Sequence, residues 1–201
     1  MSVAVKAARI DSVMSRWQPD APGRLQQAAF ELYAEHGYED TTVAEIAERA
    51  SLTERTFFRH FADKREVLFR GSSELQQLIV DAVDAAPASA TPMQAIATGL
   101  AAAGAIFDAR MRPYSRQRQT VIDANPELQE REVSKFAVLA AALADALRRR
   151  GVPNPAAGLT ADAGTAVFRV AFDHWIRDDS ERDFAWFVHD GIAELRAVAA
   201  G

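Results

Sequence analysis

Two short stretches of helical periodicity, separated by only a few residues, constrain the fold of this chain most strongly. Thr42, with Glu45 three residues later, forms a capping box, which is a common signature of a helix start. Thr53 supplies a second N-cap, and Phe57 and Phe61 follow it four residues apart, on one side of a second helix. Helices this short are marginal in water unless an apolar side packs against a neighbour. The segment therefore predicts a packed helical pair joined by a short turn.

The helical pattern extends in both directions from this pair. An apolar stripe before it predicts a helix that ends near Gly37, and the stripe consists of Leu25, Ala28, Ala29, Leu32 and Tyr33. After the pair, Asp63 and Glu66 form a second capping box, which predicts a longer helix reaching Val83. Further helices are predicted over residues 92–110, 114–124, 126–150, 157–177 and 180–199. Since no segment alternates like a β-strand for long, the expected fold class is all-α.

The outward side of the second short helix is polar, basic and aromatic. Its residues are Thr53, Glu54, Arg55, Thr56, Phe58, Arg59 and His60. Such a helix suits the major groove of DNA, and Arg55 is best placed for a bidentate contact with guanine. Thr42 and Lys64 lie near expected helix starts, where free backbone N–H groups favour a phosphate. The alternative is a helical hairpin whose charged side chains simply face water.

The charge balance does not exclude DNA as a partner. The formal net charge of the chain is −5, and residues 1–70 carry ten Lys and Arg against eleven Asp and Glu. Between Arg55 and Arg65, however, four basic residues stand against one acid. A local positive patch can contact phosphates while the rest of the molecule stays acidic, so modest non-specific DNA affinity is expected.

Four segments follow one another in a specific order between residues 24 and 70. They are AAFELYAEHGY from residue 28, TTVAEIA from residue 41, TERTFFRHF from residue 53 and KREVL from residue 64. This order closely resembles the N-terminal region of the TetR family of bacterial regulators. The resemblance implies phosphate contacts from Thr42, Phe58, His60 and Lys64. It implies base or backbone contacts from Thr53, Glu54, Arg55, Thr56 and Arg59.

Three residues depart from the usual pattern of that family. Ser51 stands in the turn where glycine is common, so the turn must accommodate a Cβ. Arg55 stands where a small residue is common, and Phe58 replaces a frequent tyrosine. We therefore expect Arg55 to determine sequence specificity, and Phe58 to stack on the sugar-phosphate backbone or a thymine methyl group.

The resemblance also implies how the chain is organised. A flexible N-terminal arm is expected at residues 1–20, a three-helix helix-turn-helix DNA-binding domain at 21–68, and an effector-binding and dimerisation domain of six to seven helices at 69–201. A homodimer would place two reading helices about one DNA turn apart on palindromic double-stranded operator DNA. Its interface is expected at Phe184, Phe187, Val188, Ile192 and Leu195, with burial inside one chain as the alternative. Whether residues 1–20 contact DNA is left open.

A small-molecule effector is expected among the middle helices. The candidate pocket residues are Phe107, Met111, Tyr114, Val121, Phe136, Phe168, Phe172 and Trp175, with ordinary core packing as the alternative. The second half of the chain is loosely similar to TetR-family effector domains that are likened to acyl-CoA binders, which implies a large apolar, acyl-type ligand. Four arginines could neutralise an anionic ligand or could simply be solvated: Arg110, Arg112, Arg116 and Arg118.

Other function classes find little support. The chain has no cysteine, no Gly-Lys phosphate loop, no Gly-x-Ser-x-Gly elbow and no His-Glu-x-x-His motif, so neither an enzyme nor a cofactor is expected. His174 and Asp178, four residues apart, leave a metal-dependent enzyme as a remote alternative. A helical interaction or ligand-binding module without DNA binding is another. No secretory signal or apolar run of membrane-spanning length is evident, so a cytoplasmic location is expected. The resemblance implies a repressor that its ligand releases from DNA.

Overall fold

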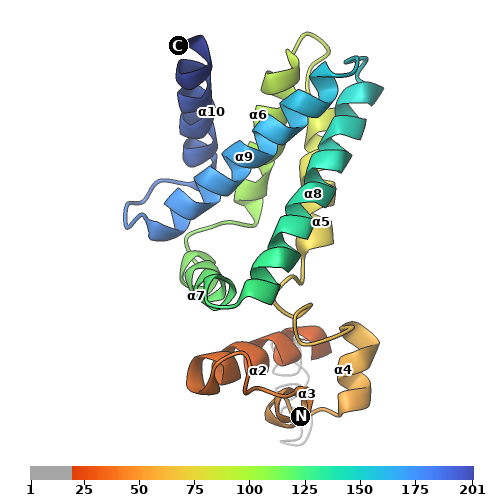
Figure 1. Ribbon diagram of the computed structural model, residues 1–201, viewed down its shortest axis with the longest axis vertical. Helices are drawn as coiled ribbons and strands as arrows, with labels where there is room; N and C mark the ends of the chain where they lie inside the picture. The colour runs from red at the N-terminus through yellow and green to blue at the C-terminus, as the bar shows by residue number, and fades with distance from the viewer. Residues whose placement is uncertain (1–19) are drawn as a thin grey trace, which may run out of the picture. The chain divides into compact units, whose positions relative to one another are not determined.

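The computed structural model describes residues 20–201, and every regular element within that range is helical (Figure 1). The prediction of an all-α fold is confirmed. The chain divides into two compact units, Met1–Leu68 and Phe69–Gly201. The arm predicted at residues 1–20 lies outside the described residues except for Asp20. The side chain of Asp20 caps the first described helix by accepting a hydrogen bond from the backbone N–H of Gly23, at 2.9 Å.

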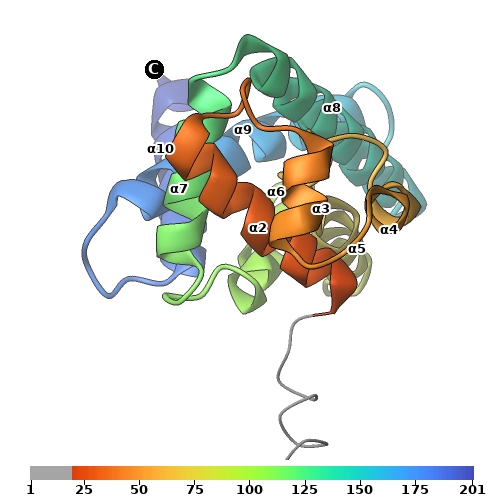
Figure 2. The same cartoon turned by 90° about the horizontal axis from the view of Figure 1, so that it is seen from below.

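Three helices make up the described part of the unit Met1–Leu68: α2 (Ala21–His36), α3 (Val43–Arg49) and α4 (Glu54–His60). They pack against one another in pairs, as Figure 2 shows from below. The capping box predicted at the start of α3 is present. The hydroxyl of Thr42 accepts from the backbone N–H of Glu45 at 3.2 Å, and the Glu45 carboxylate accepts from the backbone N–H of Thr42 at 2.7 Å. The predicted N-cap Thr53 likewise accepts from the backbone N–H of Thr56.

The core of this unit lies under α4. Phe57 is completely buried, and its ring centroid lies 5.5 Å from that of Phe61. Ala47 of α3 is also buried, which allows α3 and α4 to approach closely. Because one side of α4 is anchored in this way, its opposite side faces outward.

Ser51, in the turn between α3 and α4, adopts a left-handed backbone conformation with φ of 53°. The departure from glycine noted in the sequence therefore has a structural cost, since a Cβ disfavours this region. Arg24 of α2 holds the turn by donating hydrogen bonds to the carbonyl oxygens of Ala50, at 2.8 Å, and Ser51, at 3.2 Å.

Replacing Ser51 with glycine is expected to raise the free energy of unfolding by about 0.5–1 kcal/mol, because relief of the left-handed strain exceeds the entropy cost of glycine. Ser51→Ala retains the Cβ and serves as the matched control, with no gain expected. Chemical denaturation of both variants measures the difference. An equal change in the two variants would contradict the assignment of strain to Ser51.

The prediction of a long helix that begins at Asp63 is wrong. Residues 62–63 form a bend and residues 64–71 form turns, and α5 (Ser72–Asp84) begins only after Gly71, whose φ is 84°. A right-handed helix cannot continue through that conformation. The Asp63 carboxylate instead closes a local turn, by accepting hydrogen bonds from the backbone N–H groups of Arg65 and Glu66.

The unit Phe69–Gly201 contains the remaining described helices. After α5 these are α6 (Pro92–Ala102), a short 3₁₀ helix (Ala103–Ala105), α7 (Arg112–Asp123), α8 (Pro126–Arg149), α9 (Ala156–Arg177) and α10 (Phe184–Ala200). Two predicted boundaries are corrected. The helix predicted to reach residue 110 ends its α-helical part at Ala102. The last helix begins at Phe184 rather than at residue 180, because Asp183 caps it by accepting from the backbone N–H of Trp186.

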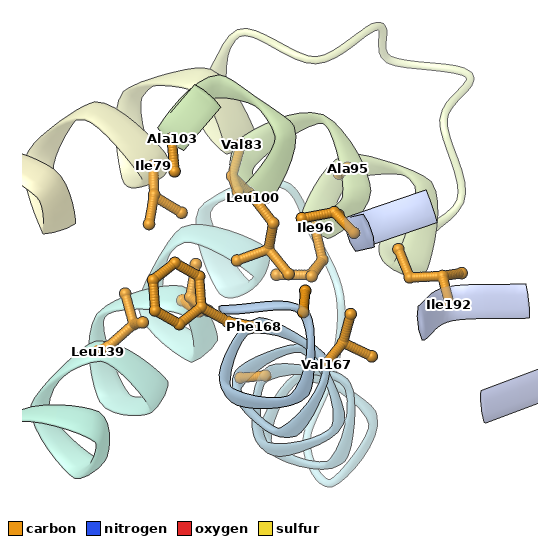
Figure 3. Close-up of a cluster of buried hydrophobic side chains, with 14 of the residues drawn as sticks. Ile79, Val83, Ala95, Ile96, Leu100, Ala103, Leu139, Val167, Phe168 and Ile192 are labelled. Carbon is orange, nitrogen blue, oxygen red and sulfur yellow. The ribbon is translucent and has the colours of Figure 1, made fainter. Parts of the chain in front are cut away.

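The core of this unit is formed where α5, α6, α8, α9 and α10 meet. Figure 3 shows Ile79, Leu100 and Phe168 directed toward a shared centre from three different helices. Two glycines permit the close packing. Gly99 of α6 lies against the backbone of α5, and Gly164 of α9 lies against Ile96 of α6. Gly164 is a small residue at a crossing, so it allows α9 to approach α6 closely.

Candidate functional site

The outward face of α4 gathers five of the residues predicted to contact DNA. Thr53, Arg55, Thr56, Phe58 and Arg59 line one open surface depression. Phe58 is 55% exposed, an unusual position for a phenylalanine. The other two predicted contacts on this helix, Glu54 and His60, are exposed as well.

Arg55 is exposed and makes no hydrogen bond or ion pair with any residue of the described range 20–201. The guanidinium group is therefore free to offer its paired N–H donors to an acceptor outside the chain. Arg59, unlike Arg55, has a neighbour within the chain, because its Nη2 lies 3.4 Å from Nε2 of His60. Thr53 also has a partner within the chain, because its hydroxyl oxygen caps the N-terminus of α4.

Lys64 lies in a turn instead of at the predicted helix start, and its ammonium is bound within the chain. Its ammonium donates hydrogen bonds to the carbonyl oxygens of Tyr38, Glu39 and Thr41, at 2.8, 3.1 and 3.1 Å. It also lies 4.3 Å from the ring centroid of Tyr38. All three ammonium protons are thus engaged, and Lys64 fixes the loop that leads into Thr42.

Thr42 is engaged in the same region. Its backbone N–H and its hydroxyl both donate to the Glu45 carboxylate, and these hydrogen bonds lower the pKa of Glu45 below its usual range. The first turn of α3 therefore already holds a carboxylate. A phosphate would have to bind at the remaining N–H groups of that turn or displace Glu45.

An ion-pair cluster that the sequence did not suggest joins α2 to α3. Arg49 donates to both oxygens of Glu35, at 3.0 and 2.7 Å, and lies 3.4 Å from Glu31. The spacing of Glu31 and Glu35 on one helical face was the available signal. The bidentate pair fixes the orientation of α3, which precedes α4.

In the unit Phe69–Gly201, the structure brings most of the predicted effector residues together. The ring centroid of Phe107 lies 5.2 Å from that of Phe172, 5.5 Å from that of Trp175 and 6.1 Å from that of Phe168. Phe136 joins through Phe168. Met111 packs against the same core, whereas Tyr114 and Val121 lie half-buried on α7. We call Phe107, Phe136, Phe168, Phe172 and Trp175 the aromatic cluster.

The residues predicted for the dimer interface are largely covered within a single chain, which favours the alternative of intrachain packing. Phe184, Phe187, Val188 and Ile192 are at most 6% exposed within a single chain, and Leu195 packs partly buried against the same core. These side chains face inward, so they offer little surface to a second chain. Helical periodicity identified an apolar face of α10 correctly but could not tell which molecule covers it.

The four arginines near residues 110–118 are neither free nor equivalent. Arg110 binds Asp108 on the surface, and Arg116 donates to the carbonyl oxygen of Ile176 and to Asp179. Arg118 forms an ion pair with Glu132, 3.1 Å apart, in which both side chains are less than one-fifth exposed. Burial lowers the pKa of Arg118. Arg112 holds the loop after α9 through three carbonyl oxygens.

The remote metal alternative gains no support. Within residues 20–201 no group of three or more His, Cys, Asp or Glu side chains is placed to hold a metal ion. The carboxylate of Asp178 binds Ser180 instead. None of the described helices is long and apolar enough to cross a membrane.

Family models match both parts of the chain. Residues 25–70 match the model described as bacterial regulatory proteins of the tetR family, and residues 90–200 match the MftR C-terminal domain. The second match alone covers more than half of the chain.

Individual relatives agree. The chain is 28% identical over 176 residues to the transcriptional regulator MftR of Mycobacterium tuberculosis, covering 85% of this chain and 87% of the relative. It is 37% identical over 101 residues to the HTH-type transcriptional regulator TcmR of Streptomyces glaucescens, and this match spans about half the length (45%) of each protein.

A solved structure shows the same fold. The transcriptional regulator FadR from Bacillus subtilis, in complex with stearoyl-CoA, superimposes with a TM-score of 0.56 at 18% identity, over 86% of this chain and 96% of that one. The helix-turn-helix motif, the helical second unit and the two family matches lead to one assignment. The chain belongs to the TetR family and is a DNA-binding transcriptional regulator.

Proposed function

We propose that this chain is a cytoplasmic, homodimeric repressor that reads palindromic operator DNA with α4 and leaves it when an acyl-type effector binds. Residues 21–68 serve as the DNA-binding domain and residues 69–201 as the effector-binding and dimerisation domain. The observation that carries the proposal is Arg55, exposed on α4 beside Phe58 and without a partner in the described part of the chain. A free guanidinium in this position suits guanine O6 and N7.

The other α4 residues have supporting roles. Thr56 and Phe58 lie beside Arg55 and suit a thymine methyl group or the sugar-phosphate backbone. Thr53, Glu54, Arg59 and His60 contact bases or phosphates at the edges of that surface. Lys64 acts indirectly, because its ammonium positions the loop before Thr42.

The homodimer is proposed to form through the outward sides of α9 and α10. Exposed apolar side chains on these two helices support this, namely Leu159, Val170, Trp186 and Val198. Covering them with a second copy would remove apolar surface from water, which favours association.

The effector is proposed to lie against the aromatic cluster. The cluster lies in the unit Phe69–Gly201, and Phe107, Phe136 and Phe172 are only partly buried. FadR, which has the same fold, is a regulator whose structure contains stearoyl-CoA. Apolar rings with few polar groups suit an acyl chain.

Fluorescence anisotropy with labelled duplex DNA from upstream of the protein's own gene tests this function. Binding is expected to be selective over a shuffled duplex of equal composition and to weaken steeply as salt is raised. Addition of lauroyl-CoA is expected to release the operator, whereas free CoA should not. Equal affinity for the two duplexes would contradict the DNA-reading proposal. Retention of the operator at saturating lauroyl-CoA would contradict the proposed release by an acyl effector.

A further inference from the structure

Two hydrogen-bond donors, one within the aromatic cluster and one next to it, are buried without an acceptor among residues 20–201. They are Nε of Arg112, at the start of α7, and Nε1 of Trp175, near the end of α9. A buried N–H group that lacks an acceptor costs about 1–3 kcal/mol, so native structures rarely retain one without a reason. Here two such groups occur together.

The two donors belong to side chains in direct contact. The guanidinium carbon of Arg112 lies 5.3 Å from the centroid of the Trp175 ring. The other nitrogens of the guanidinium are bound: Nη1 donates to the carbonyl oxygens of Asp178 and Ser180, and Nη2 donates to that of Arg182. These bonds hold the arginine in place, and its partners are neutral carbonyls. The Nε–H therefore remains as a fixed donor on a charged group.

The position of Trp175 is fixed as well. The side chain is completely buried, and its ring centroid lies 5.9 Å from that of Phe172 and 6.0 Å from that of Phe184. Phe107 contacts it at 5.5 Å. The two donors thus border an apolar surface formed by aromatic rings. Binding sites for apolar ligands commonly combine such a surface with a few polar groups that fix the orientation of the ligand.

We propose that Arg112 Nε–H and Trp175 Nε1–H bind the carbonyl oxygen of the effector, while its hydrocarbon chain lies against Phe107 and Phe172. This inference rests on the proposed function, since it assigns the polar end of the acyl site. The carbonyl of an acyl thioester supplies two lone pairs, which matches two donors. A ligand of equal chain length without that oxygen would leave both donors unpaired.

Calorimetric titration of the full chain with two matched probes tests the assignment. Lauroyl-CoA carries the carbonyl, and S-dodecyl-CoA replaces it with a methylene group. The wild-type chain is expected to bind lauroyl-CoA at least about tenfold more tightly, because one charged and one neutral hydrogen bond are lost with the thioether. Trp175→Phe keeps an aromatic ring but removes the N–H, and should lower the preference by about threefold, since only the neutral hydrogen bond is lost.

A change in packing alters the affinity for both probes alike, so the ratio of the two dissociation constants within one variant cancels most of it, as in a double-mutant cycle. Arg148→Lys, at an exposed arginine near the end of α8 that pairs with Asp145, is the control and should keep the full preference. Equal affinity of the wild-type chain for both probes would overturn the donor assignment while leaving an acyl effector in place. Binding of neither probe would overturn both proposals. A preference unchanged in Trp175→Phe would overturn the role of Trp175.

Discussion

Arg55→Ala is expected to weaken binding to the preferred operator by about 1–3 kcal/mol, or about 5- to 150-fold, and to relax the preference at one base pair in each half-site. The reason is geometric. Arg55 lies exposed on α4, and its guanidinium has no partner in residues 20–201 that it would have to leave. Its bidentate contact with guanine would therefore be lost without a compensating gain inside the protein.

The control for Arg55→Ala removes the same charge elsewhere. Arg148, near the end of α8 in the other unit, forms a surface ion pair with Asp145. Arg148→Ala should leave the base preference unchanged. Anisotropy titrations against a set of operators with single base-pair changes measure both variants. If Arg55→Ala loses the same affinity for every operator, Arg55 contacts a phosphate and does not read a base.

Gly99→Ala is expected to lower the free energy of unfolding by about 2–3 kcal/mol, through overpacking between α5 and α6. A Cβ on Gly99 would lie 2.8 Å from the carbonyl oxygen of Ile79 and would also overlap the side chain of Val83. Figure 3 shows Ile79 and Val83 on the helix that meets α6. Because one of the two obstacles is a backbone carbonyl oxygen, which cannot rotate away, the two helices themselves must separate.

Gly158→Ala is the matched control, because Gly158 is also helical but a Cβ there meets nothing within 4 Å. It should raise stability by up to about 1 kcal/mol, since alanine favours helix over glycine. Thermal and urea unfolding of both variants give the comparison. A neutral Gly99→Ala would contradict the close approach of α5 and α6.

The parts of the fold that follow from local chemistry could be predicted. The Thr42–Glu45 capping box and the Thr53 N-cap depend on residues within one helical turn, so the sequence contains the whole interaction. The same reasoning failed at Asp63, where a capping-box pattern of the same spacing, Asp63 and Glu66, closes a turn instead of starting a helix. The helix start there is delayed by Gly71, whose positive φ is set by the surrounding chain.

Long-range partners could not be predicted. The apolar stripe of α10 is visible in the sequence, but the burial of Phe184 and Ile192 within their own chain depends on how α10 packs against α6 and α9. Arg112 donates to carbonyl oxygens about 70 residues away in the sequence. Every residue has a backbone carbonyl, so the sequence cannot indicate which ones accept these hydrogen bonds. Similarly, nothing local marked Lys64 as the residue that fixes residues 38–41.

The central claim is that α4 reads a specific DNA sequence in two copies. Selection of bound duplexes from a random pool by the full wild-type chain tests it most directly. The expected result is an enriched inverted repeat whose half-sites are centred about one helical turn apart, with a guanine at a fixed position in each. Recovery of duplexes without any shared sequence, at affinities that depend only on salt, would contradict the claim.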